Sequence, residues 1–126
     1  SMVDAYTALH GAGHAHCIET WMDGELAGGL YCVSIGKAVF GESMFARRTD
    51  ASKIALAALV ALCGAQGAGW IDCQQNTAHL ASLGAQEIDR TTFVGKVALA
   101  RNQAPLHWQF EPLYWDWLLS RPPQSA

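Results

Sequence analysis

The sequence predicts an α/β (α+β) domain built on a mixed, mostly antiparallel sheet with helices on both faces. Residues 14–41 contain short apolar runs separated by glycine turns, as antiparallel strands do. The apolar segment 51–63 has the length of a helix, and the short apolar run 70–73 follows it as a strand. This strand–helix–strand order adds a parallel pair to an antiparallel meander, which makes the sheet mixed.

The composition is that of one folded domain: 126 residues, of which 51% are hydrophobic and 15% charged. The net charge is −3 and the basic residues are scattered, apart from Arg47 and Arg48, so the sequence does not indicate a surface for a nucleic-acid backbone. No apolar run reaches the ~18 residues of a membrane-spanning helix. The four cysteines lack CxxC spacing and lie in apolar runs, so we expect free thiols in a reducing compartment.

The first element is predicted to be the end of an amphipathic helix over residues 3–10, closed by the glycines that follow. Apolar residues recur there at helical spacing: Val3, Tyr6 and Leu9. No capping residue precedes them, and Ser1 before Met2 resembles the remnant of a tag. We therefore expect a parent chain with a further region upstream.

Two strands and a tight turn follow. Residues 14–21 alternate as a strand does, Asp23-Gly24 is a strong hairpin signal, and residues 26–35 form a second strand. The second run is apolar on both faces, which predicts a central position in the sheet. Gly28-Gly29 within it predicts a bulge or the close approach of another backbone.

A third strand over 38–41 leads to the longest predicted helix. Asp50 is predicted to cap a helix over 51–63 that Gly64 closes. Apolar residues lie all around this helix, which predicts burial on more than one side.

The last third of the chain is predicted to contain less regular structure. Asn76 or Thr77 can cap a helix through Leu83, and Thr91 or Thr92 can cap a helix that ends at Arg101. Glu87-Ile88 can start a short strand, and residues 102–126 are predicted to be an irregular tail rich in Trp and Pro.

The order of these elements is that of the GNAT-type acyltransferase fold. Members that use CoA hold its pyrophosphate with a glycine-rich loop at a helix N-terminus. The corresponding loop here, 47–50, has no glycine, and Asp50 places a negative charge at the helix start. We therefore expect that CoA is not the acyl carrier.

Asp72 is the first candidate site residue, because a carboxylate within an apolar strand is costly to bury unless it is paired. Gln74 lies two residues further on, on the same strand face, so the pair could hold an amine and an ester carbonyl together. The alternative interpretation is an aspartate that caps a neighbouring backbone. Glu42 follows a strand, at a sheet end where α/β folds place ligands, or it is a solvated loop carboxylate.

Two other patterns give weaker support for a catalytic or metal site. Cys73 and His79 could form a nucleophile and base, but Cys73 alternates with its neighbours and should point into the core. His14 and His16 share one strand face, yet no third ligand with standard spacing accompanies them. We expect structural roles for both histidines and no metal site.

Six motifs occur in one order: GHAHCIE at 13–19, GGLY at 28–31, GESMF at 41–45, ASK at 51–53, IDCQ at 71–74 and HLASLGA at 79–85. Together they resemble the leucyl/phenylalanyl-tRNA–protein transferase family over about residues 3–97. The family's small N-terminal domain and the first part of its catalytic domain have no counterpart here. Thr77 stands where the family often has Asn.

The resemblance implies a partial GNAT-like catalytic domain over residues 1–126 of a bacterial cytoplasmic enzyme. Such an enzyme moves Leu or Phe from aminoacyl-tRNA to the N-terminal Arg or Lys of proteins, which marks them for degradation by the N-end rule. It implies no cofactor, because the tRNA ester is already activated. Asp72 and Gln74 would be catalytic, and Glu42 would bind the cationic acceptor. Three residues match the family's apolar pocket for Leu or Phe, or are plain core: Leu30, Val39 and Leu59.

Two other functions compete with this one: a CoA-dependent N-acetyltransferase and a non-catalytic binding module. We also expect the 126-residue chain by itself to be inactive on full aminoacyl-tRNA, because a tRNA-binding surface needs clustered cations.

Overall fold

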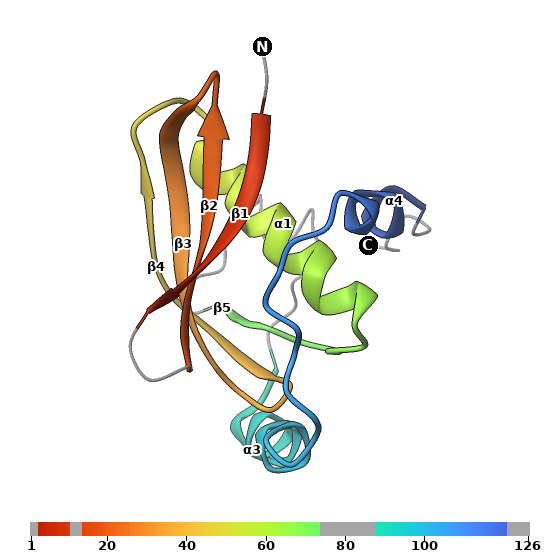
Figure 1. The fold of residues 1–126 in the computed structure, drawn as a ribbon. Coiled ribbons are helices and arrows are strands. Elements are labelled where there is room, and N and C mark those ends of the chain that lie inside the picture. Colours follow the sequence, from red (N-terminus) through yellow and green to blue (C-terminus); the bar gives the residue numbers. More distant parts are fainter. Residues whose placement is uncertain (1–2, 11–13, 74–87, 121–126) are drawn as a thin grey trace.

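The computed structural model describes residues 3–10, 14–73 and 88–120, with the backbone alone for 6–10. Its strands are β1 (Val3–His10), β2 (Ala15–Met22), β3 (Glu25–Ile35), β4 (Ala38–Ala46) and β5 (Asp72–Cys73). Its helices are α1 (Ala51–Ala65), α3 (Arg90–Ala100) and α4 (Leu113–Ser120). Figure 1 shows α1 along one face of the sheet and α3 near one end of the strands. In this described part of the chain, no helix is long and apolar enough to cross a membrane.

The strands form one sheet in the order β1-β2-β3-β4-β5. The first four pair antiparallel with their sequence neighbours, and β5 pairs parallel with β4. The predicted mixed, mostly antiparallel sheet is therefore confirmed, with β3 in its middle. The predicted turn between β2 and β3 is also confirmed, since Asp23 and Gly24 have φ angles of 53° and 82°, as a tight hairpin turn requires.

Residues 3–10 form strand β1, so the predicted helix is wrong. The strand pairs with β2 along its whole length, from Val3 opposite Met22 to His10 opposite Ala15. A helix this short is marginal in water, whereas the strand satisfies the backbone groups along the edge of β2. The helical spacing of three apolar residues is outweighed by this non-local pairing.

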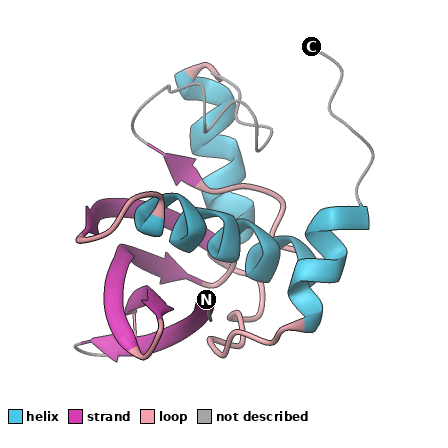
Figure 2. Ribbon diagram, turned by 90° about the horizontal axis from the view of Figure 1, so that it is seen from above, coloured by secondary structure: helices cyan, strands magenta, loops and turns pink. Residues whose placement is uncertain are grey.

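The start of α1 is fixed directly on the sheet. The Thr20 side chain is fully buried and its hydroxyl donates a hydrogen bond of 2.8 Å to the carbonyl oxygen of Ala51. A Cβ on Gly28 would lie 2.7 Å from the Cβ of Ala51. The close backbone approach predicted at this glycine is confirmed, and Figure 2 shows α1 running across the strands.

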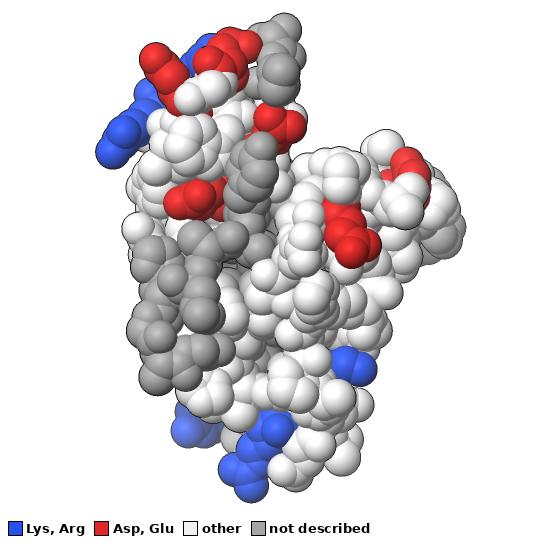
Figure 3. Space-filling view, viewed as in Figure 1, with Lys and Arg blue, Asp and Glu red and all other residues white. Residues whose placement is uncertain are grey.

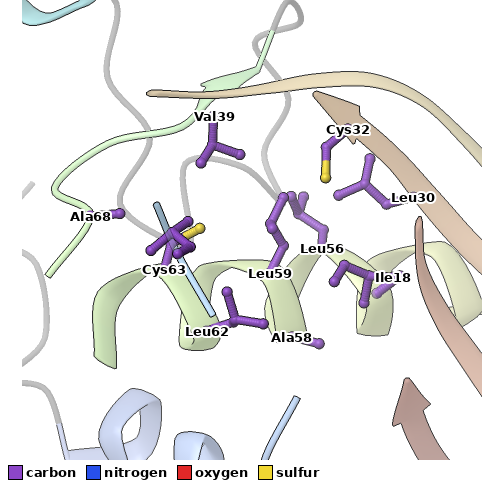
Figure 4. Close-up of a cluster of buried hydrophobic side chains, with 12 residues drawn as sticks. Ile18, Leu30, Cys32, Val39, Leu56, Ala58, Leu59, Leu62, Cys63 and Ala68 are labelled. Atoms are coloured by element: carbon purple, nitrogen blue, oxygen red, sulfur yellow. The ribbon is translucent and has the colours of Figure 1, made fainter. Parts of the chain in front are cut away.

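The main core lies between α1 and the sheet (Figure 4). It consists of Ile18, Leu30, Cys32, Val39, Ala55, Leu56, Ala58, Leu59, Leu62, Cys63, Ala68 and Leu106. A further side of α1 contacts α4. The predicted burial of this helix on more than one side is therefore confirmed.

Both predicted ends of α1 need correction. Asp50 is at the N-cap position, but its φ is 66° and its side chain caps no backbone amide. Its carboxylate instead lies 3.7 Å from the Lys53 ammonium. The helix continues past Gly64, and Gly67 with a φ of 80° reverses the chain. A Cβ on Gly64 would overlap the ring of Trp117, so this glycine serves packing between α1 and α4.

The second face of the sheet is covered in part by α3. Val39 faces α1 in the core, so its neighbour Phe40 points to the opposite face. The Phe40 ring packs against Phe93 of α3 and against Trp70, with ring centroids 6.4 Å and 5.9 Å away. Helices therefore lie on both faces, as predicted.

The cap of α3 differs from the one predicted. Asp89, rather than Thr91 or Thr92, is the N-cap: its carboxylate accepts a hydrogen bond of 2.7 Å from the backbone N–H of Thr92. Hydrogen bonds from Thr92 lower the pKa of this carboxyl group. An aspartate is as good a cap as threonine, and the helix begins where its side chain can reach the third amide.

The predicted irregular tail contains helix α4, which the sequence analysis missed. Two of its aromatic residues, Tyr114 and Trp115, pack against the main core, so tertiary contacts rather than propensity account for this short helix. Ile88, expected in a strand, is not part of one. The helix predicted to end at Leu83 lies outside the described residues.

Candidate active site

The candidate site is built on the parallel pair of β4 and β5. Asp72 pairs with Phe40, and Cys73 pairs with Gly41. A Cβ on Gly41 would make ordinary van der Waals contact with the backbone carbonyl oxygen of Asp72, at 3.4 Å, so the two strands lie in direct contact. The sequence therefore places Asp72 on a short edge strand whose register is fixed by its partner.

Asp72 and Cys73 point to opposite faces of the sheet. Cys73 packs against the main core, as predicted, and is partly buried there. Asp72 shares a register position with Phe40 and therefore lies on the face away from α1. Burial, and then the negative charge of Asp72, raise the pKa of the Cys73 thiol. A protonated, core-facing thiol is a poor nucleophile, which agrees with a structural role for Cys73.

Glu42 lies within β4 rather than in a loop after it, which corrects the sequence analysis. Cys32 of β3 pairs with Gly41 and Tyr31 pairs with Ser43, so Glu42 is the extra residue of a β-bulge. A bulge redirects a side chain and bends its strand, and bulges are frequent next to active sites. Glu42 is exposed, next to the point where β5 pairs with β4.

The negative charge of Glu42 contributes to the raised pKa of the Cys32 thiol. Burial, with smaller contributions from Cys17 and Glu42, raises the pKa of the Cys32 thiol to about 12. Neither Glu42 nor Asp72 forms an ion pair with another described residue. The β4–β5 edge therefore presents two carboxylates whose charges are not balanced within the described structure.

Gln74 and His79 lie outside the described residues, so the predicted pair Asp72 and Gln74 stays a prediction. The three predicted pocket residues lie together in the main core, with Leu30 4% exposed and Val39 and Leu59 fully buried. This placement accounts for their apolar character as core residues, and their role in substrate binding stays a prediction.

The two histidines on β2 and before it have structural contacts. The Nδ1 atom of His14 lies 3.2 Å from the backbone carbonyl oxygen of Ser34. The buried His16 ring stacks on Trp108, with centroids 4.0 Å apart and planes 7° from parallel. Within residues 3–10, 14–73 and 88–120 no group of three or more metal-ligating side chains occurs.

An aromatic cluster that was not predicted from the sequence packs against the strand pair of the site. Phe40, Trp70 and Phe93 contact each other edge to face, with centroid distances of 5.9–6.4 Å. Phe40 is the register partner of Asp72, so α3 packs directly against the strand pair that carries this carboxylate. Trp70 precedes Asp72 by two residues, on the same strand alternation, and this spacing is the signal that was available.

The antiparallel strands, helix α1 and the parallel strand β5 follow one another in the order that the sequence predicts, and Asp72 and Glu42 lie on the paired strands β5 and β4. The comparison with known families is specific: the model of the leucyl/phenylalanyl-tRNA protein transferase family matches residues 1–98. The chain belongs to this family.

Curated relatives agree with this assignment. The leucyl/phenylalanyl-tRNA–protein transferase of Polaromonas sp. (strain JS666) is 61% identical over 119 residues, covering 94% of this chain and 47% of the relative. The enzyme of that name from Albidiferax ferrireducens is 59% identical over 92% of this chain and 46% of its own length. The one from Leptothrix cholodnii is 58% identical over 94% and 47%. The chain thus spans about half the length of the curated relatives it matches.

Proposed function

We propose that this chain forms the part of an aminoacyltransferase that joins the carboxyl group of Leu or Phe, carried by tRNA, to the amino terminus of an acceptor protein. One observation carries the proposal: Asp72, in the family's Asp-Cys-Gln motif, lies on β5, which pairs with β4 directly before the bulge at Glu42. Both carboxylates lack ion-pair partners in the described part of the chain. A cationic acceptor would supply the missing charge.

The reaction needs alignment more than activation. The free α-amino group of the acceptor attacks the ester carbonyl carbon, a peptide bond forms, and the ribose oxygen leaves with a proton. Asp72 would accept a hydrogen bond from the attacking amine and take up or orient its proton. Gln74 would hold the amine or the ester carbonyl. Positioning of this kind lowers a barrier by up to ~7–11 kcal/mol, and no cofactor enters the balance.

Acceptor selection is proposed to depend on Glu42. An N-terminal Arg or Lys carries a cationic side chain, which a carboxylate binds through a charge-assisted hydrogen bond. Leu30, Val39 and Leu59 would contact the apolar Leu or Phe side chain of the donor, which requires the core to rearrange because all three are buried. The product would be a protein with a new apolar N-terminus, marked for degradation in the bacterial cytoplasm.

A CoA-dependent acetyltransferase is less well supported. The loop before α1 contains no glycine, and Asp50 has its carboxylate at the helix start, paired at 3.7 Å with Lys53. A negative charge next to a helix N-terminus, in a loop without glycine, makes that end of the helix a poorer site for a pyrophosphate.

The test is a transfer assay on a peptide that begins with Arg. The donors are charged leucine tRNA, a short leucyl-nucleotide and acetyl-CoA, and the product is identified by mass spectrometry. We expect leucylated peptide from the leucyl-nucleotide and no product from acetyl-CoA. An acetylated peptide, or no product from any donor, contradicts the proposal. Turnover on charged tRNA equal to that of the Polaromonas relative contradicts the narrower expectation that this chain by itself is inactive on full tRNA.

A further inference from the structure

Three cations lie along one helix and its C-cap. Arg90 and Lys96 belong to α3 and Arg101 is its C-cap, and the helix contains no acidic residue. All three residues are exposed. These cations are separated by five or six positions in the sequence, and the structure places them on one helix.

A fourth cation adjoins them through the β3–β4 turn. The backbone N–H of Lys37 donates a hydrogen bond of 2.9 Å to the carbonyl oxygen of Ala100. A Cβ on Gly36 would lie 2.7 Å from the carbonyl oxygen of Arg101, so the turn packs tightly on the end of α3. We call Lys37, Arg90, Lys96 and Arg101 the α3 basic surface. Figure 3 shows Lys and Arg at this end of the molecule, away from the red carboxylates.

A second group of cations provides an internal comparison. Arg47 and Arg48 lie between β4 and α1, and Lys53 lies in the first turn of α1. Figure 3 shows Lys and Arg mixed with Asp and Glu at the other end of the molecule. The Arg48 guanidinium lies 3.5 Å from Asp23 and the Lys53 ammonium lies 3.7 Å from Asp50.

The α3 basic surface has no such compensation. Across the described ranges of the chain, no ion pair involves any of its four cations. The nearest acid in the sequence, Asp89, directs its carboxylate to the backbone of Thr92. The chain as a whole is negative, at −3, so this local positive charge needs an external counterpart.

The α3 basic surface adjoins the candidate active site. Phe93 of α3 contacts Phe40 and Trp70, with centroids 6.4 Å and 5.9 Å apart. Phe40 is the register partner of Asp72. Cations for an anionic substrate and carboxylates for a cationic one therefore lie on neighbouring elements.

We propose that the α3 basic surface binds phosphates of the RNA part of the aminoacyl-tRNA, near its acceptor end, while the 3′ ester reaches the β4–β5 edge. The proposal rests on the proposed function for the identity of the polyanion. A basic helix with exposed apolar residues, here Val94 and Leu99 at 54% and 74% exposure, also suits an anionic membrane surface. RNA is favoured because the largest apolar residue of α3, Phe93, is committed to the sheet.

The test measures RNA binding by the 126-residue chain with fluorescence anisotropy, over a series of salt concentrations. The probe is a short RNA hairpin with a single-stranded 3′ end, without an amino acid. Four phosphate contacts predict a slope of log affinity against log salt of about −3, since each contact contributes ~0.7–0.9. No measurable binding at low salt would overturn the proposal.

Two triple variants with the same change in net charge distinguish an effect of the α3 basic surface on RNA binding from an effect of net charge. The first is Arg90→Gln, Lys96→Gln and Arg101→Gln, and the matched control is Arg47→Gln, Arg48→Gln and Lys53→Gln. We expect the first to weaken binding at least about tenfold and to reduce the slope by about 2–3, and the control to leave the slope unchanged. All six residues are exposed, so the substitutions should not disturb the core. A melting curve of each variant is the control for folding.

Two results with RNA would overturn the proposal: equal weakening by both triple variants, or no weakening by the first. A third such result is that the first triple variant loses binding to anionic phosphatidylglycerol vesicles but keeps its RNA binding. The last result would assign the surface to a membrane. RNA binding is measured without transfer, so the two proposals can fail separately. If RNA binding depends on α3 but the transfer assay gives no product, only the proposed chemistry is contradicted. Transfer without α3-dependent binding would sink this inference alone.

Discussion

The indole ring of Trp117 lies so close to the α-carbon of Gly64 that any Cβ on Gly64 would overlap it. Gly64 belongs to α1 and Trp117 to α4, so the absence of a side chain at one position allows the two helices to touch. The same glycine viewed in the sequence alone suggests a helix end. The contact makes Gly64 a packing residue whose replacement has a predictable sign.

Gly64→Ala is expected to destabilise the fold. In an open helix position alanine is favoured over glycine by ~1 kcal/mol. Here the added methyl group must displace the Trp117 ring, and overpacking of this kind costs ~1–3 kcal/mol. Urea denaturation should show a lower free energy of unfolding. In a Trp117→Leu background the same substitution should become neutral or stabilising, and a stabilising effect with Trp117 present would contradict the contact.

Thr20→Val is expected to lower the free energy of unfolding by ~1–2 kcal/mol. The shape is retained, but the buried hydrogen bond of 2.8 Å to the Ala51 carbonyl oxygen is lost. Hydrogen exchange should also quicken in the first turn of α1. The matched control is Thr91→Val on exposed α3, where a change within ~0.5 kcal/mol is expected. Equal effects of the two substitutions would mean that the hydroxyl does not anchor the helix.

Local signals account for what the sequence predicts correctly. The β2–β3 hairpin depends on Asp23-Gly24 alone, and the helix over 51–63 depends on its own apolar residues. Strand β1 depends on its pairing with β2, and helix α4 depends on its contacts with α1, which is distant in the sequence. The apolar spacing of residues 3–10 and the composition of residues 113–120 do not contain that information, so these two segments are mispredicted.

The same division holds for the site. Asp72 is identifiable from the sequence because a lone carboxylate in an apolar strand is unusual. The bulge at Glu42 is not, because it exists only in the register between β3 and β4. The aromatic contact of Phe93 with Trp70 joins residues 23 positions apart, and it too requires the tertiary fold.

Asp89 is expected to make the stability of α3 depend on pH. Hydrogen bonds from Thr92 lower the pKa of its carboxyl group in the folded state. The stabilising contribution is therefore present above the ordinary Asp pKa of 3.8 and is lost as pH falls through the lowered folded-state value. Asp89→Ala should give α3 amides faster hydrogen exchange at pH 6 but little further change at pH 2–3. A wild-type chain with equal α3 protection at both pH values would contradict the cap.

Glu42→Gln is expected to raise the KM for peptides that begin with Arg or Lys. A hydrogen bond between charged groups exceeds a neutral one by ~1 kcal/mol, which corresponds to about fivefold in KM. A peptide that begins with citrulline, the neutral analogue of arginine, is the control and should show no change. An effect on the KM for the leucyl-nucleotide instead would place Glu42 in the donor site.

Asp72→Asn is expected to change two measurements in opposite directions. The negative charge of Asp72 contributes to the raised pKa of the adjacent Cys73 thiol, after burial. Its removal should lower that pKa, increase the thiolate fraction at pH 8 and quicken the reaction of Cys73 with an aromatic disulfide reagent. Cys73 is the selective reporter, because the other three cysteines are buried. Transfer from the leucyl-nucleotide should fall about 100-fold, as for loss of a general base.

The two readouts separate the charge of Asp72 from its place in the fold. Asparagine keeps the size of the side chain, so a normal melting curve is expected, and unchanged hydrogen exchange of the β5 amides would show that β5 still pairs with β4. Slow transfer then reports the loss of the carboxylate itself. Asp116→Asn on exposed α4 removes the same charge away from β5 and should leave both measurements unchanged. Wild-type transfer by Asp72→Asn would remove Asp72 from the mechanism, and an unchanged Cys73 rate would contradict the effect of the Asp72 charge on the thiol.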